Sequence, residues 1–112
     1  MKIKKITCSE VKELRNGKYE YLILQGCGGD LNDWVDGITK LFREQGIIDD
    51  SFSFDEVYTF ENNNLTNLAF GLNSKKINMG KLAPFRLIIR EDFGAMWLSD
   101  YIDNGYIKDI NI

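Results

Sequence analysis

A run of apolar residues spaced three and four apart occupies the second quarter of the chain. Its members are Leu31, Trp34, Val35, Ile38, Leu41 and Phe42. This spacing gathers them on one face of a helix over residues 31–45, with Asp30 as the N-cap and Gly46 just beyond the last turn. Gly37 in the helix interior costs up to about 1 kcal/mol relative to alanine, which indicates a closely packed neighbour.

The N-terminal part of the chain predicts a β-hairpin. Asn16 and Gly17 form the preferred pair for a two-residue type I′ turn and lie between two segments with apolar positions. The resulting register sets Glu13 opposite Glu20, and like charges directly opposite each other are unfavourable. A short helix over residues 9–14 is therefore the alternative to the outer part of the hairpin.

Alternating apolar residues predict further strands in the second half of the chain. Residues 57–60 form one strand and residues 65–72 the returning strand, joined by a turn of three asparagines at 62–64. Residues 73–84 form an irregular connection with one helical turn near its end. The apolar run at 85–90 predicts a strand that is buried on both faces.

The C-terminal part of the chain has two interpretations. Trp97, Ser99 and Tyr101 alternate after a bend at Gly94, which favours a strand over residues 95–102. A helix over the same residues is the alternative, because its apolar residues would then share one side.

These elements together predict one α+β domain over residues 1–112. We expect a mainly antiparallel sheet with one principal amphipathic helix packed on one face. A chain of 112 residues can bury one hydrophobic core and is too short for two. With 44% hydrophobic and 28% charged residues, it is typical of a globular rather than a disordered protein.

Charge and hydropathy restrict the location and the partners of this protein. No segment approaches the roughly 20 apolar residues that span a bilayer, and no apolar stretch follows the basic start MKIKKITCSE. We therefore expect a soluble, cytoplasmic protein without membrane association, whose two cysteines stay thiols. A net charge of −3 argues against a nucleic-acid ligand, so another protein is the expected partner.

The absence of histidine narrows the available chemistry. It excludes every histidine-based triad, cysteine–histidine pair and histidine metal site. The glycine-rich stretch GCGGD at 26–30 matches only the start of a dinucleotide loop, because Leu31 replaces the third glycine. Asp30 and Asp33 also occupy the helix N-terminus where a phosphate would bind. The stretch is better interpreted as a tight strand-to-helix turn, and we expect neither a metal nor a cofactor.

One thiol is a candidate reactive group. Cys27 lies close to the predicted helix N-terminus, where the helix dipole can lower the pKa of a thiol. The two nearby aspartates oppose that effect, and the chain has no histidine to accept the proton. The alternative is a buried cysteine that serves only the packing of the core.

A second candidate is a surface for a protein partner near the C-terminus. Trp97 and Tyr101 lie among carboxylates, with Asp100 and Asp103 the nearest in sequence. An exposed aromatic and acidic surface of this kind would suit a basic partner protein. The alternative is that both rings cover the sheet.

Four segments of the chain carry a resemblance to a known family. They are YLILQGCGGDLNDWVDGI (21–38), LTNLAF (65–70), MGKLAPFRL (79–87) and FGAMWLSDYI (93–102). These segments resemble a family of small uncharacterised proteins from Gram-positive bacteria and their mobile elements. The resemblance implies homology over most of the chain and an accessory role in a bacterial cell, and it implies no activity.

The sequence therefore supports two functional hypotheses. The first is a non-enzymatic protein-interaction or accessory and regulatory protein, which the acidic balance and the lack of an intact catalytic motif favour. The second is a small enzyme or ligand-binding domain that uses carboxylates or Cys27.

Overall fold

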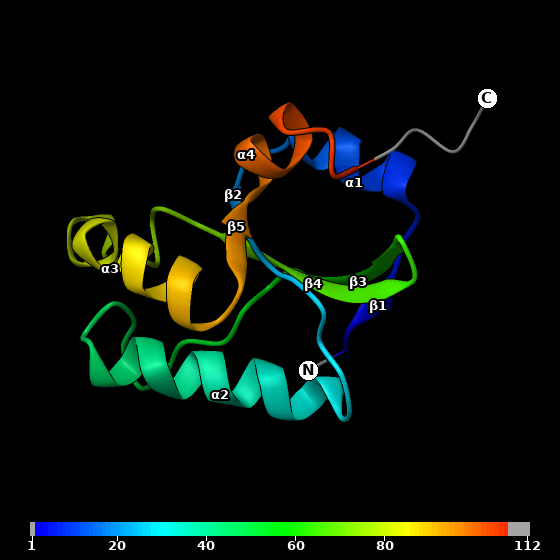
Figure 1. The fold of residues 1–112 in the computed structure, drawn as a ribbon. Coiled ribbons are helices and arrows are strands. Elements are labelled where there is room, and N and C mark those ends of the chain that lie inside the picture. The colour runs from blue at the N-terminus through cyan, green and yellow to red at the C-terminus, as the bar shows by residue number, and fades with distance from the viewer. Residues whose placement is uncertain (1, 108–112) are drawn as a thin grey trace.

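A five-stranded sheet with strand order β1-β3-β4-β2-β5 forms the middle layer of the molecule in the computed structural model, which describes residues 2–107 (Figure 1). The strands are β1 (Lys4–Lys5), β2 (Glu20–Leu24), β3 (Val57–Asn62), β4 (Leu65–Leu72) and β5 (Ala95–Trp97). Only β1 and β3 are parallel, and the other neighbouring strands are antiparallel. The expected α+β domain with a mainly antiparallel sheet is confirmed.

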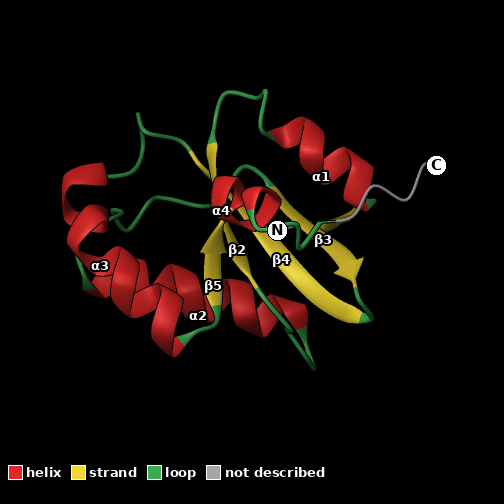
Figure 2. Cartoon of the chain, turned by 45° about the horizontal axis from the view of Figure 1, so that its top comes forward, coloured by secondary structure: helices red, strands yellow, loops and turns green. Residues whose placement is uncertain are grey.

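Helices cover both faces of this sheet (Figure 2). On one face lie α1 (Cys8–Leu14) and α4 (Leu98–Asp103), and on the other lie α2 (Leu31–Glu44) and α3 (Met79–Asp92). The principal amphipathic helix that we expected on one face is α2, and helices cover the other face as well. The reason is that β2 and β4 are apolar on both sides, so each face of the sheet needs a cover.

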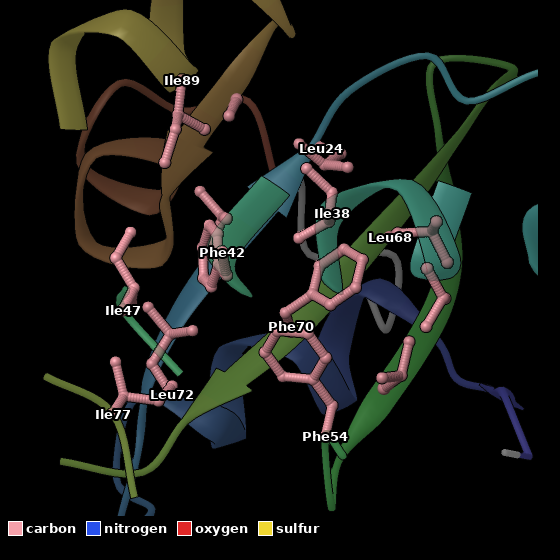
Figure 3. Packing of buried hydrophobic residues seen from close by; sticks show 14 of the residues in the cluster. Leu24, Ile38, Phe42, Ile47, Phe54, Leu68, Phe70, Leu72, Ile77 and Ile89 are labelled. Atoms are coloured by element: carbon pink, nitrogen blue, oxygen red, sulfur yellow. The ribbon is translucent and has the colours of Figure 1, made fainter. Parts of the chain in front are cut away.

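The larger of two hydrophobic clusters lies between the sheet and the pair α2 and α3 (Figure 3). Three rings meet there edge to face: Phe54 lies 6.0 Å from Phe42 and 5.1 Å from Phe70, measured between ring centroids. The smaller cluster lies under α1 and α4 and contains Val11 and Phe60, both fully buried. No helix among residues 2–107 has the length and apolar character needed to cross a bilayer.

The predicted helix over residues 31–45 is confirmed as α2. The Asp30 side chain accepts a hydrogen bond from the Asn32 N–H at 2.9 Å, and Gly46 has a φ of 70° at the end of the helix. The prediction that another residue packs closely against Gly37 is wrong. A Cβ atom at this exposed position would meet nothing within 4 Å.

The predicted N-terminal hairpin is wrong, and the alternative of a short helix is confirmed by α1. Thr7 and Glu10 form a capping box, in which the Thr7 hydroxyl accepts from the Glu10 N–H at 3.2 Å. A strand at residues 9–14 would also find no partner, because β4 and β5 occupy both edges of β2. Asn16 and Gly17 instead end the turn that follows α1.

The central hairpin of β3 and β4 is confirmed. Asn63 and Asn64 have φ values of 53° and 65°, as a type I′ turn requires. The outer edge of β3 is closed by the N-terminal segment: Ile6 N–H donates to the Thr59 carbonyl at 2.9 Å, and the Cys8 thiol donates to the Glu61 carbonyl at 3.1 Å. This edge therefore has few groups left for a further strand.

The predicted strand at 85–90 is wrong, because these residues belong to α3. Its N-cap is Asn78, whose side chain accepts from the Lys81 N–H at 3.2 Å. Leu82 and Ile89 face the core, whereas Leu87 and Ile88 face outward. At 95–102 both interpretations hold in part, since β5 ends at Trp97 and α4 begins at Leu98.

Candidate functional site

An apolar stripe follows the outer side of α3. It consists of Ala83, Pro84, Leu87 and Ile88, which repeat at a spacing of four residues and are all exposed. The exposed fraction is 63% for Leu87 and 46% for Ile88. Large exposed aliphatic side chains that stand next to each other, with charged residues beside them, are typical of surfaces that bind another protein.

A pocket of about 250 Å³ adjoins this stripe where α3 crosses β5. It is lined by Ala83, Arg86, Leu87, Arg90 and Trp97. Trp97 forms its base, because the indole is 7% exposed and belongs to the core cluster beneath α3. We call the apolar stripe together with the residues of this pocket the α3–β5 surface.

Arg86 is held firmly in this surface. Its guanidinium carbon lies 4.2 Å from the centroid of the Trp97 ring, and its Nη2 forms an ion pair with Glu20 at 2.8 Å. Its Nε is buried and has no hydrogen-bond partner among residues 2–107. The planar guanidinium therefore keeps one N–H without an acceptor.

Arg90 lies one helical turn further along the same side of α3. Its Nη1 is 3.6 Å from Oδ2 of Asp100, and both side chains are partly exposed at 48% and 40%. Exposed ion pairs of this length contribute little to stability, so Arg90 can exchange this partner for another anion. The two arginines that line the pocket are thus each paired with one carboxylate, Glu20 and Asp100.

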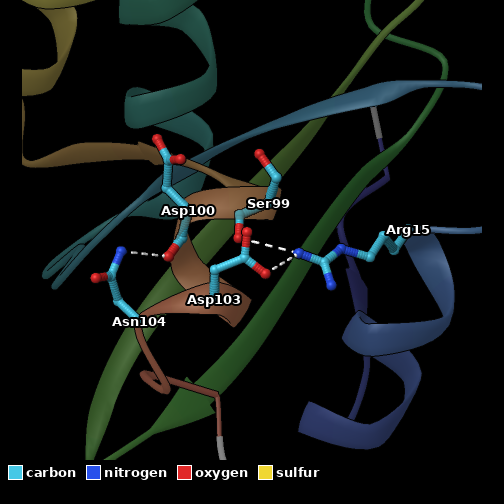
Figure 4. A network of polar contacts seen from close by, with 5 residues as sticks. All are labelled: Arg15, Ser99, Asp100, Asp103 and Asn104. Atoms are coloured by element: carbon cyan, nitrogen blue, oxygen red, sulfur yellow. Dashed lines mark hydrogen bonds and ion pairs between the residues drawn. The ribbon is translucent and has the colours of Figure 1, made fainter.

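The structure brings together only some of the residues predicted as a partner surface. Trp97 and Asp100 belong to the α3–β5 surface or adjoin it. Asp103 lies elsewhere and accepts from Arg15 Nη2 at 2.6 Å, while the same guanidinium donates to the Ser99 carbonyl at 3.1 Å (Figure 4). Both acidic side chains are therefore paired within the molecule.

Tyr101 lies on the opposite face of the sheet from Trp97. It is 3% exposed, and its hydroxyl contacts the side chains of Asn62 at 3.3 Å and Asn67 at 3.5 Å. Both rings thus cover the sheet, which is the alternative that the sequence left open. The exposed aromatic surface that we expected for a basic partner is not formed by these two residues.

Leu87 and Ile88 were missed as candidates because their apolar run was interpreted as a buried strand. A helical signal was nevertheless present in the sequence. Leu82 and Ile89 are seven residues apart, which places them on one face of a helix, and Asn78 is a suitable N-cap for it. In such a helix Leu87 and Ile88 lie outside the buried face and form the outward apolar stripe.

Cys27 has the properties of a packed cysteine. It is 4% exposed, and burial raises the pKa of its thiol to about 11, although a backbone hydrogen bond from Leu68 acts in the opposite direction. A nucleophilic thiol needs the reverse shift. Cys27 belongs to the cluster under α2 and α3, and Cys8 to the cluster on the other face, so the two free thiols lie apart.

The glycine-rich loop acts as a strand-to-helix turn. Gly26 and Gly29 have φ values of 65° and 76°, and the Cys27 N–H donates to the Thr66 carbonyl at 2.7 Å. The Trp34 indole donates to the Gly28 carbonyl at 2.8 Å and thereby ties the loop to α2. Within residues 2–107, no group of three or more cysteine or acidic side chains is arranged to hold a metal ion.

The segments behind the family resemblance lie on all layers of the fold, including β2, α2, β4, α3 and β5. That resemblance remains a prediction. Comparisons with protein-family models, with curated proteins and with solved structures found no match to this chain.

Proposed function

We propose that this domain is a non-enzymatic interaction protein whose α3–β5 surface binds an amphipathic helix of a partner protein. The observation that carries the proposal is the exposure of Leu87 and Ile88 beside a pocket with Trp97 at its base. A partner side chain that enters this pocket would contact aliphatic, aromatic and guanidinium groups at once. Interface hot spots are enriched in tryptophan and arginine, and they lie in pockets of this kind.

The gain from covering the stripe supports binding. Complete burial of one leucine side chain from water is worth about 1.5–3 kcal/mol, and the stripe offers Leu87 and Ile88 side by side. Ala83 and Pro84 extend the apolar surface by one helical turn. The stripe follows a single helix, so a second helix laid along it would meet apolar side chains on two successive turns, before the exposed Glu91 and Asp92.

The charges beside the stripe indicate an acidic partner. Arg86 and Arg90 both line the pocket beside the stripe, and Arg90 is only loosely paired with Asp100. Aspartate or glutamate next to the apolar residues of the partner would complement the Arg90 guanidinium. The expectation of a basic partner depended on Asp100 and Asp103. Asp103 is held by Arg15 at 2.6 Å, while Asp100 shares the looser ion pair with Arg90.

The competing hypothesis of a thiol enzyme has lost its main support. Cys27 is buried, and burial raises the pKa of its thiol, so its thiolate is scarce at neutral pH. Cys8 is also buried, its pKa is raised by the same cause, and its thiol donates to a backbone carbonyl. We therefore place neither cysteine in a catalytic role.

A selection experiment tests the proposed function. A displayed library of randomised helical peptides is selected on the intact domain, and binders that also bind the Leu87→Asp variant are removed. We expect enrichment of peptides with an apolar stripe beside aspartate and glutamate. Failure to enrich any sequence, or enrichment of basic peptides, would contradict the proposal. A wild-type dimer in sedimentation that Leu87→Asp dissociates would assign the surface to a second copy instead.

A further inference from the structure

A cavity lies on the face of the sheet opposite to α3. It has a volume of about 450 Å³ and opens between α1 and the strands β1, β2 and β3. Three tyrosines line it: Tyr19, Tyr21 and Tyr58. We call this cavity the tyrosine cleft. It shares no residue with the α3–β5 surface, so what it binds is independent of the proposed function.

The Glu56 carboxylate lies among these three rings. The Tyr21 hydroxyl donates a hydrogen bond to its Oε2, and Tyr58 lies two residues further along the chain. Burial first, and then the neighbouring Glu56 carboxylate, raise the pKa of Tyr21 and of Tyr58. Both phenols therefore stay protonated at neutral pH. The Tyr21 hydroxyl is already used in its bond to Glu56, so the rings offer a ligand their π faces rather than a base.

Two of the rings pack against each other. The centroids of Tyr21 and Tyr58 are 6.4 Å apart, and their planes are inclined by 42°. Gly71 on β4 permits this arrangement, because a Cβ atom there would come within 2.9 Å of the Tyr19 ring and 3.1 Å of Glu56 Cβ. A larger residue at position 71 would push Tyr19 and Glu56 into the cleft.

Within the described part of the chain, the charge of Glu56 is not balanced by an ion pair. Among residues 2–107, no lysine or arginine lies within 4.0 Å of its carboxylate oxygens. Lys4 and Lys18 line the cleft, together with Glu10 and Glu13, so its five charged side chains sum to −1 from three glutamates and two lysines. A carboxylate that is half-buried among aromatic rings gains from a cation placed against it.

We infer that the tyrosine cleft binds a guanidinium group, with Glu56 as its anionic partner and the tyrosine rings as its aromatic walls. A guanidinium is planar, stacks on aromatic rings, and is more weakly hydrated than an ammonium ion. It can donate to the Glu56 carboxylate while one of its faces lies against a tyrosine ring. The arginine side chain of a polypeptide and a free guanidino compound share this chemistry.

Titration by NMR tests this inference with N-acetylarginine amide as the probe, at constant ionic strength. We expect saturable shifts of the ring resonances of Tyr19, Tyr21 and Tyr58, and weaker binding of N-acetyllysine amide. In the Glu56→Gln variant the Kd should rise at least about tenfold, because the amide can still accept from Tyr21 but carries no charge. The matched control is Glu61→Gln, an exposed glutamate on β3 outside the cleft, which should bind as the wild type does.

A second variant and a peptide probe complete the test. Tyr58→Leu removes one aromatic wall and keeps the charge of Glu56, so it should also weaken binding. This variant tests the inference even if Glu56→Gln does not fold. An alanine peptide with one central arginine distinguishes the sources: binding as tight as that of the amide indicates a polypeptide, and exclusion of the peptide indicates a free compound. Absence of saturation, equal affinity in Glu56→Gln, or equally tight binding of the lysine probe would each overturn the inference.

Discussion

The guanidinium of Arg86 lies 4.2 Å from the centroid of the Trp97 ring, and the same side chain forms an ion pair with Glu20 at 2.8 Å. The flat face of the Arg86 guanidinium thus contacts Trp97 on β5, and its Nη2 contacts Glu20 on β2. Because β2 and β5 are adjacent strands, Arg86 joins the helix to the sheet at the place where the α3–β5 surface is hollowed.

Replacing Arg86 should reduce stability more than replacing Arg90. Lysine keeps the charge of Arg86 but loses both the planar contact with Trp97 and the fork that reaches Glu20. We expect Arg86→Lys to lower the free energy of unfolding by about 1 kcal/mol, as measured by urea denaturation. The matched control is Arg90→Lys, whose ion pair is longer and exposed and should cost less than about 0.5 kcal/mol. Equal losses would refute the role of the ring contact.

The buried polar groups under α4 should contribute to stability as a network. The Tyr101 hydroxyl lies between Asn62 and Asn67, and Asn67 also accepts from the Gly26 N–H at 3.3 Å. Tyr101→Phe leaves these amides short of a partner, so we expect a loss of about 1–3 kcal/mol in the free energy of unfolding. Tyr106→Phe is the control, because this ring is 46% exposed, and it should be nearly neutral. A neutral Tyr101→Phe would contradict the network.

Alkaline pH should destabilise the protein in part through Cys27. The folded thiol has its pKa raised from 9.0 to about 11, so above pH 9 the unfolded chain loses a proton that the folded chain retains. This contribution to the free energy of unfolding is complete below pH 9. It falls by about 2 kcal/mol as the pH rises to 11. Between pH 8 and pH 10.5, the urea midpoint should fall further for the wild type than for Cys27→Ala. Parallel pH profiles would show that the thiol does not titrate differently on folding.

The elements that sequence reasoning placed correctly have strong local signals. The helix α2 has its cap at Asp30 and its apolar face in its own sequence, and the hairpin of β3 and β4 has its turn in Asn63 and Asn64. Local hydrogen bonding and periodicity decide these elements, so no knowledge of the rest of the fold is needed.

The errors arose where tertiary contacts decide the structure. Residues 9–14 fit a hairpin locally, but the edges of β2 are already occupied by β4 and β5. The run at 85–90 is apolar on both sides, and this pattern does not distinguish a doubly buried strand from a helix with an exposed apolar stripe. For the same reason the sequence did not reveal Leu87 and Ile88, because their exposure depends on the position of α3.

The tyrosine cleft could not be inferred from sequence either. Its residues come from separate segments of the sequence. Tyr19 and Tyr21 precede α2, and Glu56 and Tyr58 follow it. Only the pairing of β2 with β4 and of β4 with β3 brings them together. The glycine that makes room for them lies on β4 between these strands.

The affinity of a selected helical peptide for three forms of the domain tests the central claim most directly. The forms are the wild type, Leu87→Asp and Leu65→Asp, and Leu65 is another exposed leucine, at the β3–β4 turn. Both substitutions lie on the surface, and each should change the free energy of unfolding by less than about 0.5 kcal/mol. Our account predicts a Kd at least about tenfold higher for Leu87→Asp and an unchanged Kd for Leu65→Asp. Equal affinities for all three forms would contradict it.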